Sequence, residues 1–338
     1  MPQESDPLLR QVLRITPEPY TYFDNYQVHR LLTENPLEYL DWVRRGLADI
    51  AHGAVQLELP PKQIFPDPKN GSDFRLMPCI ARKSASTCKT VKIIGTNTLQ
   101  QQIPDQITVG KAFVLHPEEN YVSHIFEGCL LSSARTGACA ALATQLLAPA
   151  CQSLTVIGAG RVGYYAAFYT ASSGHIQSIQ VTDSDHARAA NTAELLAATF
   201  PGMRVNATPV QELSDTDVVI LATTSKEPLC HPPAWGANLV ISLGADTDNQ
   251  RELSPSWADN ADIFVDTRDS TRFGDLAAWL KAGLITTDRP TSLFDLLRQM
   301  TLTPATRPRL FISTGSALFD NLTISYILEQ ATRSLSCR

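Results

Sequence analysis

The chain has 338 residues, with 28 Lys and Arg against 34 Asp and Glu, a formal net charge of −6, 43% hydrophobic and 18% charged residues. This composition is typical of a globular protein with room for two domains, and it argues against nucleic acid or an anionic membrane as a partner. The seven cysteines form no CxxC pair and the seven histidines show no metal-ligand spacing. We therefore expect a cytoplasmic protein with reduced thiols and no metal, signal peptide or transmembrane segment.

The first 150 residues predict two helices around a group of strands. Residues 1 to about 20 are Pro-rich and polar, which indicates an arm or a first edge segment. Apolar residues recur at three- and four-residue steps between 35 and 53, as in a helix. Extended segments are expected at 57–64, 73–79 and 90–95, and an antiparallel pair at 111–115 and 122–126. Residues 128–148 then form a long helix rich in small residues.

Two cations in this region stand among apolar or small neighbours. Lys92 interrupts the strand at 90–95, where a lysine usually marks an edge position or a stem that extends to water. Arg135 lies in the small-residue helix, and a buried guanidinium is costly unless it meets an anion. We therefore expect an anion beside Arg135, and the residues alone leave the role of Lys92 open.

The most informative motif follows an apolar strand that begins at Leu154. It is a glycine loop that opens a helix, made of Gly158, Ala159, Gly160, Arg161, Val162 and Gly163. In such a loop the first glycine permits a tight turn, the second lets a pyrophosphate approach the backbone, and the third lets helix and strand pack closely. The helix N-terminus then favours the phosphate charge. The loop predicts a dinucleotide site.

An acidic residue in the expected place supports that prediction. The strand at 178–182 ends at Asp183, twenty residues after the loop, where a carboxylate can accept hydrogen bonds from a ribose 2′-hydroxyl. A carboxylate there would repel a 2′-phosphate, so NAD is favoured over NADP. Arg188 lies close enough in sequence to reach a 2′-phosphate, so NADP is the less favoured alternative. Asp185 is an alternative ribose contact.

After the loop, strand and helix patterns alternate. Strands are expected at 205–208, 217–222, 238–243, 263–266 and 309–313, and helices at 185–200, 273–283 and 292–300. Such alternation predicts a doubly wound parallel sheet. Residues 317–332 carry a broad apolar face and predict a final docking helix.

Four motifs in this order resemble the ornithine cyclodeaminase/mu-crystallin family over nearly the whole chain. They are the glycine loop, the helix around Arg135 and Thr136, the segment Gly244-Ala-Asp246 with Glu252-Leu, and Leu310-Phe-Ile-Ser-Thr-Gly-Ser-Ala-Leu-Phe-Asp320. The resemblance implies a Rossmann domain, residues 141–313, inserted in an α+β substrate-binding and dimerisation domain, residues 1–140 plus 314–338. It also implies NAD as cofactor, an amino-acid substrate and a homodimer.

The resemblance assigns roles to matching positions. Arg135 would bind the substrate's α-carboxylate with the strand lysine, which is Lys92 by local pattern or Lys89 by an ungapped count, and Lys62 would complete the clamp. Asp246 would be the acid/base group at the reacting amine. The cofactor's phosphates or ribose would contact Thr136 and the loop that contains Thr223, Thr224 and Ser225.

One departure from the family pattern bears on the substrate. Ornithine cyclodeaminases place a glutamate two residues before the methionine of their Leu-Met-Pro motif, where it helps to hold the distal ammonium. This chain has Arg75 there, which would repel an ammonium and attract a second carboxylate if it faces the site.

The resemblance leaves several functions open. We favour cyclodeamination of lysine or ornithine, in which the hydride returns internally. The alternative is a dehydrogenase or imine reductase for an amino acid or an opine-like secondary amine, such as N-(2-amino-2-carboxyethyl)-glutamate, the precursor of 2,3-diaminopropionate. A cofactor-loaded binding protein, as mu-crystallins are for thyroid hormone, is disfavoured because Asp246 is retained.

Overall fold

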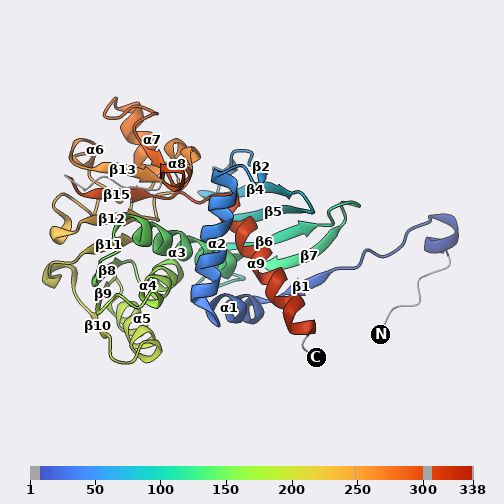
Figure 1. The fold of residues 1–338 in the computed structure, drawn as a ribbon, viewed down its shortest axis with the longest axis horizontal. Coiled ribbons are helices and arrows are strands. Elements are labelled where there is room, and N and C mark those ends of the chain that lie inside the picture. The colour runs from blue at the N-terminus through green and yellow to red at the C-terminus, as the bar shows by residue number, and fades with distance from the viewer. Residues whose placement is uncertain (1–7, 248, 300–306, 337–338) are drawn as a thin grey trace.

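The computed structural model describes residues 8–247, 249–299 and 307–336, which form two sheets linked by helices (Figure 1). The first sheet has the order β1-β7-β6-β5-β4-β2, with β3 also paired to β4. All its pairings are antiparallel except that of β1 with β7. Its strands are β1 (Thr21–Phe23), β2 (Gln56–Glu58), β3 (Gln63–Asp67), β4 (Ser72–Lys83), β5 (Ser86–Thr96), β6 (Thr108–Leu115) and β7 (Val122–Glu127).

The second sheet is parallel throughout and has the order β10-β9-β8-β11-β12-β15-β13-β14. Its strands are β8 (Ser153–Ile157), β9 (Ser178–Thr182), β10 (Arg204–Ala207), β11 (Val218–Leu221), β12 (Leu239–Ser242), β13 (Asp262–Val265), β14 (Thr291–Ser292) and β15 (Arg309–Ile312). The predicted fold class, a doubly wound parallel sheet beside a mixed α+β sheet, is confirmed.

Helices cover both faces of the parallel sheet. The helices of the described chain are α1 (Asn25–Thr33), α2 (Pro36–Ala51), α3 (Gly128–Leu147), α4 (Arg161–Ser172), α5 (His186–Thr199), α6 (Trp257–Asn260), α7 (Gly274–Lys281), α8 (Leu293–Gln299) and α9 (Ala317–Ser336). Alternate residues of β8, β11 and β12 enter one core with α3, α4 and α5 and another with α6 and α7. This is the alternation expected of strands buried on both faces.

Most of the expected elements are present, and two helices, α1 and the four-residue α6, were not expected. The predicted helix at 292–300 matches α8, although residue 300 lies outside the described part of the chain. The expected extended segment at 57–64 is split into β2 and β3, since Pro60 and Pro61 cannot donate to a ladder. Helix α1 begins with a capping box formed by Asp24 and Gln27, which is a sequence signal for its start.

Helix α3 connects the two halves of the molecule. It is buried on nearly all sides, as expected for a helix without a polar face, and it packs against β6 of the first sheet and against α4 of the second half. Helix α9 returns from β15 to pack against β4 and β5. The inner face of the first sheet therefore meets α3 and α9, and this is where the cationic side chains lie. We propose that the boundaries between the two domains lie between residues 140 and 141 and between residues 313 and 314.

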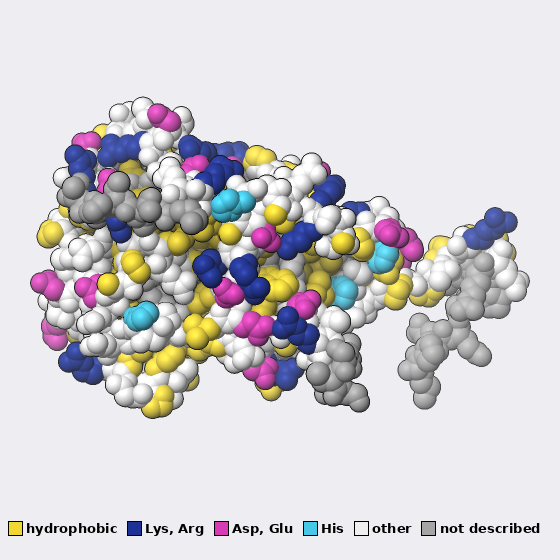
Figure 2. Space-filling model, in the orientation of Figure 1, with side chains coloured by type: hydrophobic (Ala, Val, Ile, Leu, Met, Phe, Trp, Pro, Cys, Tyr) yellow, Lys and Arg dark blue, Asp and Glu magenta, His cyan; other side chains and the backbone are white. Residues whose placement is uncertain are grey.

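The outer face of the first sheet carries exposed apolar side chains. Phe65 and Phe74 stack with ring centroids 4.8 Å apart and are 41% and 49% exposed. Ile93 on β5 and Tyr22 on β1, at the opposite edge of the sheet, are also exposed. Residues 8–20 leave the body of the molecule beside β1 (Figure 2). Among the described helices, none is long and apolar enough to cross a membrane.

Candidate active site

The glycine loop has the geometry that a bound pyrophosphate requires. Gly158 has φ +104°, and a Cβ there would lie 2.4 Å from the Ala222 carbonyl oxygen. A Cβ on Gly163 would lie 1.9 Å from the Gly158 oxygen, so both positions exclude a side chain. A Cβ on Gly160 would meet no atom within 4 Å. This open backbone at the N-terminus of α4 leaves room for an anion, so the loop fits a dinucleotide.

Asp183 lies at the end of β9, next to the loop, as predicted. Its Oδ2 accepts a hydrogen bond from the Ala159 backbone N–H at 2.7 Å. Arg188 lies 3.7 Å from Asp183 and 3.4 Å from Asp185, so its guanidinium already has two carboxylate partners. Asp185 caps α5 by accepting from the N–H groups of Ala187 and Arg188, which assigns it a local structural role.

The Thr223–Ser225 loop follows β11 and lies beside the glycine loop, as shown by a Cβ on Gly158, which would come within 3.2 Å of the Thr223 side chain.

Glu252, to which the sequence assigned no role, connects the strand ends at this edge of the sheet. Glu252 is fully buried and accepts from Thr223 N at 2.7 Å, Ser242 Oγ at 2.7 Å and Gly244 N at 2.9 Å. It thereby ties the ends of β11 and β12 together. Its place in the Glu252-Leu motif was the only sequence signal.

The side chains of three other predicted cofactor contacts, Thr136, Arg161 and Val162, contact other parts of the protein. Thr136 donates its hydroxyl to the Ser132 carbonyl oxygen at 2.8 Å, one turn back in α3. The Arg161 Nη1 donates to the Asp105 carbonyl oxygen at 3.1 Å, so its side chain spans to the loop between β5 and β6. Val162 packs against the large core cluster, which leaves its backbone N–H as the group available to a phosphate.

The predicted anion beside Arg135 is present, and it belongs to the protein. Asp320, on the first turn of α9, accepts from Arg135 Nε at 3.0 Å and from Lys92 Nζ at 2.9 Å. All three side chains are buried. Burial is the main cause that lowers the pKa of Lys92, to about 7, while Arg135 adds to the effect and Asp320 opposes it. Sequence reasoning missed Asp320, although it ends the quoted motif of the final segment.

The structure places Lys92 and Lys89 on opposite faces of β5. Lys89 is on the outer face and donates to the Pro117 carbonyl oxygen and to Asn120 Oδ1, both at 2.6 Å. Lys92 is on the inner face with Arg135. Side chains three apart on a strand point in opposite directions, so only Lys92 can belong to the inner cluster.

Lys62 reaches the same cluster from the segment between β2 and β3. Its Nζ donates to the Thr314 carbonyl oxygen at 3.0 Å and lies 4.1 Å from the centre of the Phe273 ring. Burial is the main cause that lowers the pKa of Lys62, to about 8, and the nearby carboxylate of Asp246 opposes it. Lys62 therefore connects the first sheet to the loops of the second.

Arg75 faces the inner cluster and pairs with two carboxylates. Its Nε lies 2.8 Å from Asp73 Oδ1, its Nη2 lies 3.2 Å from Asp73 Oδ2, and its Nη1 donates to Asp246 Oδ2. Burial opposes the charge on Arg75, but Asp246 and Asp73 outweigh it and raise the pKa of the guanidinium. In turn, burial tends to raise the pKa of Asp246, and Arg75 and Lys62 overcome this and lower it. Asp246 is therefore held as a carboxylate.

Gly315 packs end-on against the guanidinium of Arg135. A Cβ at this position would lie 2.9 Å from Nη2 and 3.0 Å from Nη1 of Arg135, so only glycine allows this close approach. Asp320 binds the Nε side of the guanidinium, and Nη2 donates to Ser132 Oγ. Glycine at 315 therefore helps to set the position of the guanidinium. Its place in the motif of the final segment was the sequence signal.

Gly315→Ala should therefore weaken binding of a carboxylate substrate, raising KM by about 10-fold or more, because the new methyl would press against both Nη nitrogens and displace the Arg135 guanidinium. Gly315 has φ +82°, so strain alone could lower stability. Gly283→Ala is the matched control, since Gly283 has φ +71° and open space around its Cβ position. An equal KM in the two variants would remove Gly315 from the carboxylate site.

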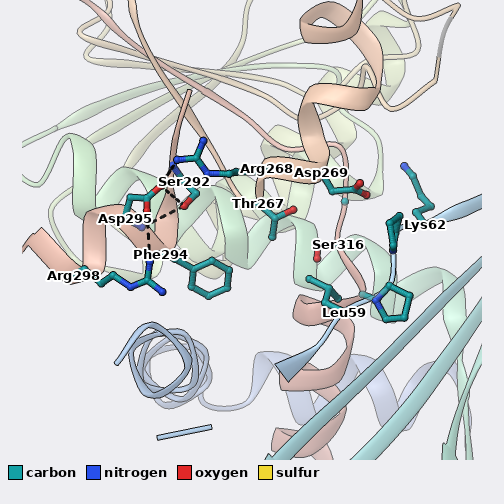
Figure 3. A pocket seen from close by; sticks show the side chains of 14 residues that line it. Leu59, Lys62, Thr267, Arg268, Asp269, Ser292, Phe294, Asp295, Arg298 and Ser316 are labelled. Carbon is teal, nitrogen blue, oxygen red and sulfur yellow. Dashed lines mark hydrogen bonds and ion pairs between the residues drawn. The ribbon is translucent and has the colours of Figure 1, made fainter. Parts of the chain in front are cut away.

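A cavity of about 340 Å³ adjoins the cluster between the first sheet and the loops of the second. Figure 3 shows Lys62 at one end and Arg268, Asp295 and Arg298 at the other. Arg268 lies 3.1 Å and Arg298 3.7 Å from Asp295, so both arginines are paired. In the described parts of the chain, no group of three or more His, Cys, Asp or Glu could hold a metal ion.

Curated relatives and solved structures cover most of the chain. A lysine cyclodeaminase from Streptomyces rapamycinicus is 28% identical over 85% of this chain and 83% of its own length. An uncharacterised Schizosaccharomyces pombe protein is 29% identical over 57% of this chain. The iminosuccinate reductase of Paracoccus denitrificans is 27% identical over 52%. These two matches span only 63% and 56% of those relatives' lengths.

Two solved structures share the fold over 93% of this chain. Thermococcus litoralis Δ1-pyrroline-2-carboxylate reductase, in complex with NADH and L-proline, has a TM-score of 0.82 at 20% identity, with 98% of its chain covered. An archaeal alanine dehydrogenase dimer with bound NAD has a TM-score of 0.80 at 19% identity, with 97% covered. The model of the ornithine cyclodeaminase/mu-crystallin family matches residues 26–334. The chain therefore belongs to the ornithine cyclodeaminase/mu-crystallin family.

Proposed function

We propose that this enzyme interconverts an α-amino acid and its α-imino acid with net oxidation or reduction, as a dehydrogenase or imine reductase. The observation that carries the proposal is the convergence of three buried cations, Arg135, Lys92 and Lys62, of which Asp320 pairs with the first two. Arg135 would bind the α-carboxylate through two parallel hydrogen bonds. Lys92 and Lys62 would add charge at the same group.

Asp246 is the acid/base group in this proposal. Its side chain is 32% exposed, and Arg75 and Lys62 keep its pKa low despite burial, so it can receive a proton from the substrate nitrogen during oxidation. In the reductive direction the same oxygen would donate that proton back. A bound nicotinamide would supply or accept the hydride at the carbon that bears this nitrogen. We propose NAD rather than NADP because Asp183 lies at the end of β9 beside the glycine loop, where a carboxylate would repel a 2′-phosphate.

Arg75 supports a substrate with a second carboxylate. Within the described residues three of its five N–H groups have partners, in Asp73 and Asp246, which leaves two to bind an oxygen of the substrate. Its side chain is only 11% exposed, so an approaching ammonium would meet a poorly solvated cation. We therefore propose an amino dicarboxylate or an opine-like secondary amine.

Cyclodeamination of lysine or ornithine is the second candidate. The similarity to a lysine cyclodeaminase over 85% of this chain favours it. A distal ammonium would then have to lie away from Arg75, for example in the cavity between Lys62 and Asp295. The same carboxylate clamp and the same acid/base group would serve this reaction.

A substrate panel separates the two candidates. Purified enzyme with NAD⁺ is given aspartate, glutamate, alanine, lysine, ornithine and N-(2-amino-2-carboxyethyl)-glutamate separately, and NADH absorbance and ammonia are followed together. NADH formed in proportion to a dicarboxylic substrate supports our proposal. Ammonia released from lysine or ornithine without NADH would replace it with the cyclodeaminase.

Arg75→Glu should reverse the charge preference of the site. We expect kcat/KM for the dicarboxylic substrate to fall about 100-fold or more, because the new carboxylate repels the second acidic group. The kcat/KM values for lysine and ornithine should rise relative to that of the dicarboxylic substrate. Arg82→Ala is the control, since Arg82 lies on the same strand but is paired with Glu58 at the surface. An unchanged ratio of dicarboxylate to diamine would place the second group elsewhere.

We also propose that the enzyme is a homodimer formed through the outer face of the first sheet. The exposed side chains of Phe65, Phe74, Ile93 and Tyr22 share this face, and burying such apolar area drives association. Sedimentation of the full chain, compared with Phe74→Glu, checks this interface.

A further inference from the structure

Both carboxylate oxygens of Asp320 contact the buried cations Lys92 and Arg135. One oxygen, Oδ1, accepts from both Arg135 Nε at 3.0 Å and Lys92 Nζ at 2.9 Å. The other, Oδ2, lies 2.8 Å from the same Nζ. Asp320 is 1% exposed and comes from α9, whereas the cations come from α3 and β5. A single buried carboxylate therefore joins three elements.

Ser132 completes the arrangement from one side. Its Oγ accepts from Lys92 Nζ at 3.1 Å and from Arg135 Nη2 at 3.1 Å. A lysine ammonium has three N–H groups, and Asp320 and Ser132 engage two of them. The third N–H of Lys92 and the remaining N–H groups of Arg135 are what the cluster can offer to a ligand. Asp320 and Ser132 thus determine which donors stay available.

We propose that Asp320 is a positioning residue that aims Lys92 and Arg135 at the substrate's α-carboxylate and keeps the Lys92 ammonium charged. This inference rests on the proposed carboxylate site. Preorganised donors bind an anion without further ordering of their side chains, which is why fixing both cations beforehand improves binding. The N-terminal turn of α9 also favours a negative charge at residue 320.

Charge balance at Lys92 gives the proposal a distinctive signature. The charged groups that face Lys92 are Arg135 from α3, Lys62 from the β2–β3 segment and Asp320 from α9, and only Asp320 favours its protonated form. Tyr39 on α2 and Cys79 on β4 also lie near Asp320, and both are neutral because burial raises their pKa values. Without Asp320 the pKa of Lys92 should fall further below about 7.

The sign of the pH effect follows from this lowered pKa. A neutral Lys92 cannot attract a carboxylate, so binding should weaken as pH rises through the pKa of Lys92. In Asp320→Asn that loss should begin at a lower pH, and the variant should differ most from the wild type near neutrality. A purely structural defect would instead weaken binding by the same factor at every pH.

The test measures pyruvate binding to the NADH-loaded full chain by calorimetry, since pyruvate keeps one charge over this range and no turnover is needed. For Asp320→Asn we expect a Kd about 100-fold above the wild type near pH 7.5, with a much smaller ratio near pH 5.5. Glu329→Gln, an exposed position on the same helix, should match the wild type. An unchanged Kd, or one raised equally at both pH values, would overturn the proposal.

A second variant covers the case in which Asp320→Asn does not fold. The double variant Lys92→Met/Asp320→Asn removes one buried cation together with the carboxylate, so it should fold with a Tm above that of Asp320→Asn. A double variant that is no more stable would show that charge pairing is not the role of Asp320. Failure of the proposed function would appear separately, as wild-type enzyme that binds pyruvate but turns over no substrate in the panel.

Discussion

Asp246→Asn should lower kcat by about 10²–10⁴-fold, the usual contribution of a positioned acid/base group. The amide keeps the shape of the side chain but cannot accept the proton of the substrate nitrogen. Arg75 would keep its two contacts to Asp73, so the guanidinium would stay in place. Dissociation of NADH should be unchanged, because the glycine loop and Asp183 are untouched. Steady-state kinetics and an NADH fluorescence titration measure the two quantities.

Asp259→Asn is a suitable control for Asp246→Asn, because the Asp259 side chain is 85% exposed. It should behave as the wild type in both measurements. A fully active Asp246→Asn enzyme would exclude Asp246 as the proton acceptor. A variant that loses NADH binding as well would show that Asp246 supports the cofactor side of the site, and the loss of activity could then not be assigned to proton transfer.

The low pKa of Asp246 also predicts the shape of the pH profile. Because Arg75 and Lys62 hold the carboxylate ionised despite its burial, its protonation should not limit kcat/KM near neutral pH. The alkaline side should instead show the loss of the ammonium forms of Lys92, with a pKa of about 7, and of Lys62, with a pKa of about 8. This holds for the oxidative direction, in which Asp246 must be ionised, and kcat/KM in that direction is therefore expected to decline as pH rises through this range.

The cofactor half of the site could be predicted from sequence because its geometry is local. The loop from Gly158 to Gly163 and the acid at Asp183 lie within one strand-helix-strand unit, where spacing along the chain fixes spacing in space. The structure adds why each glycine is required, since Gly158 and Gly163 approach backbone oxygens closely while Gly160 stays open. Only the supporting role of Glu252 was missed.

The substrate half depends on contacts between distant segments. Composition correctly indicated that Arg135 needs an anion, but Asp320 lies 185 residues away, so the sequence could not identify it. The choice between Lys92 and Lys89 depends on which face of β5 is buried. Likewise, Arg75 and Asp246 are 171 residues apart, and only the packing of the first sheet against the second brings them into contact.

Arg135→Lys should raise KM about 100-fold, equivalent to ~2.7 kcal/mol, while the fold and NADH binding persist. Lysine keeps the charge and can still pair with Asp320, but it lacks the two-nitrogen edge that faces Gly315, so bidentate recognition of the carboxylate is lost. Arg44→Lys, at an exposed ion pair on α2, is the control. If KM stayed at the wild-type value while kcat fell, Arg135 would act on the transition state rather than as the clamp of the bound substrate. If neither constant changed, the α-carboxylate would have to bind through Lys62 and Lys92 alone, and Arg135 would have no part in recognition.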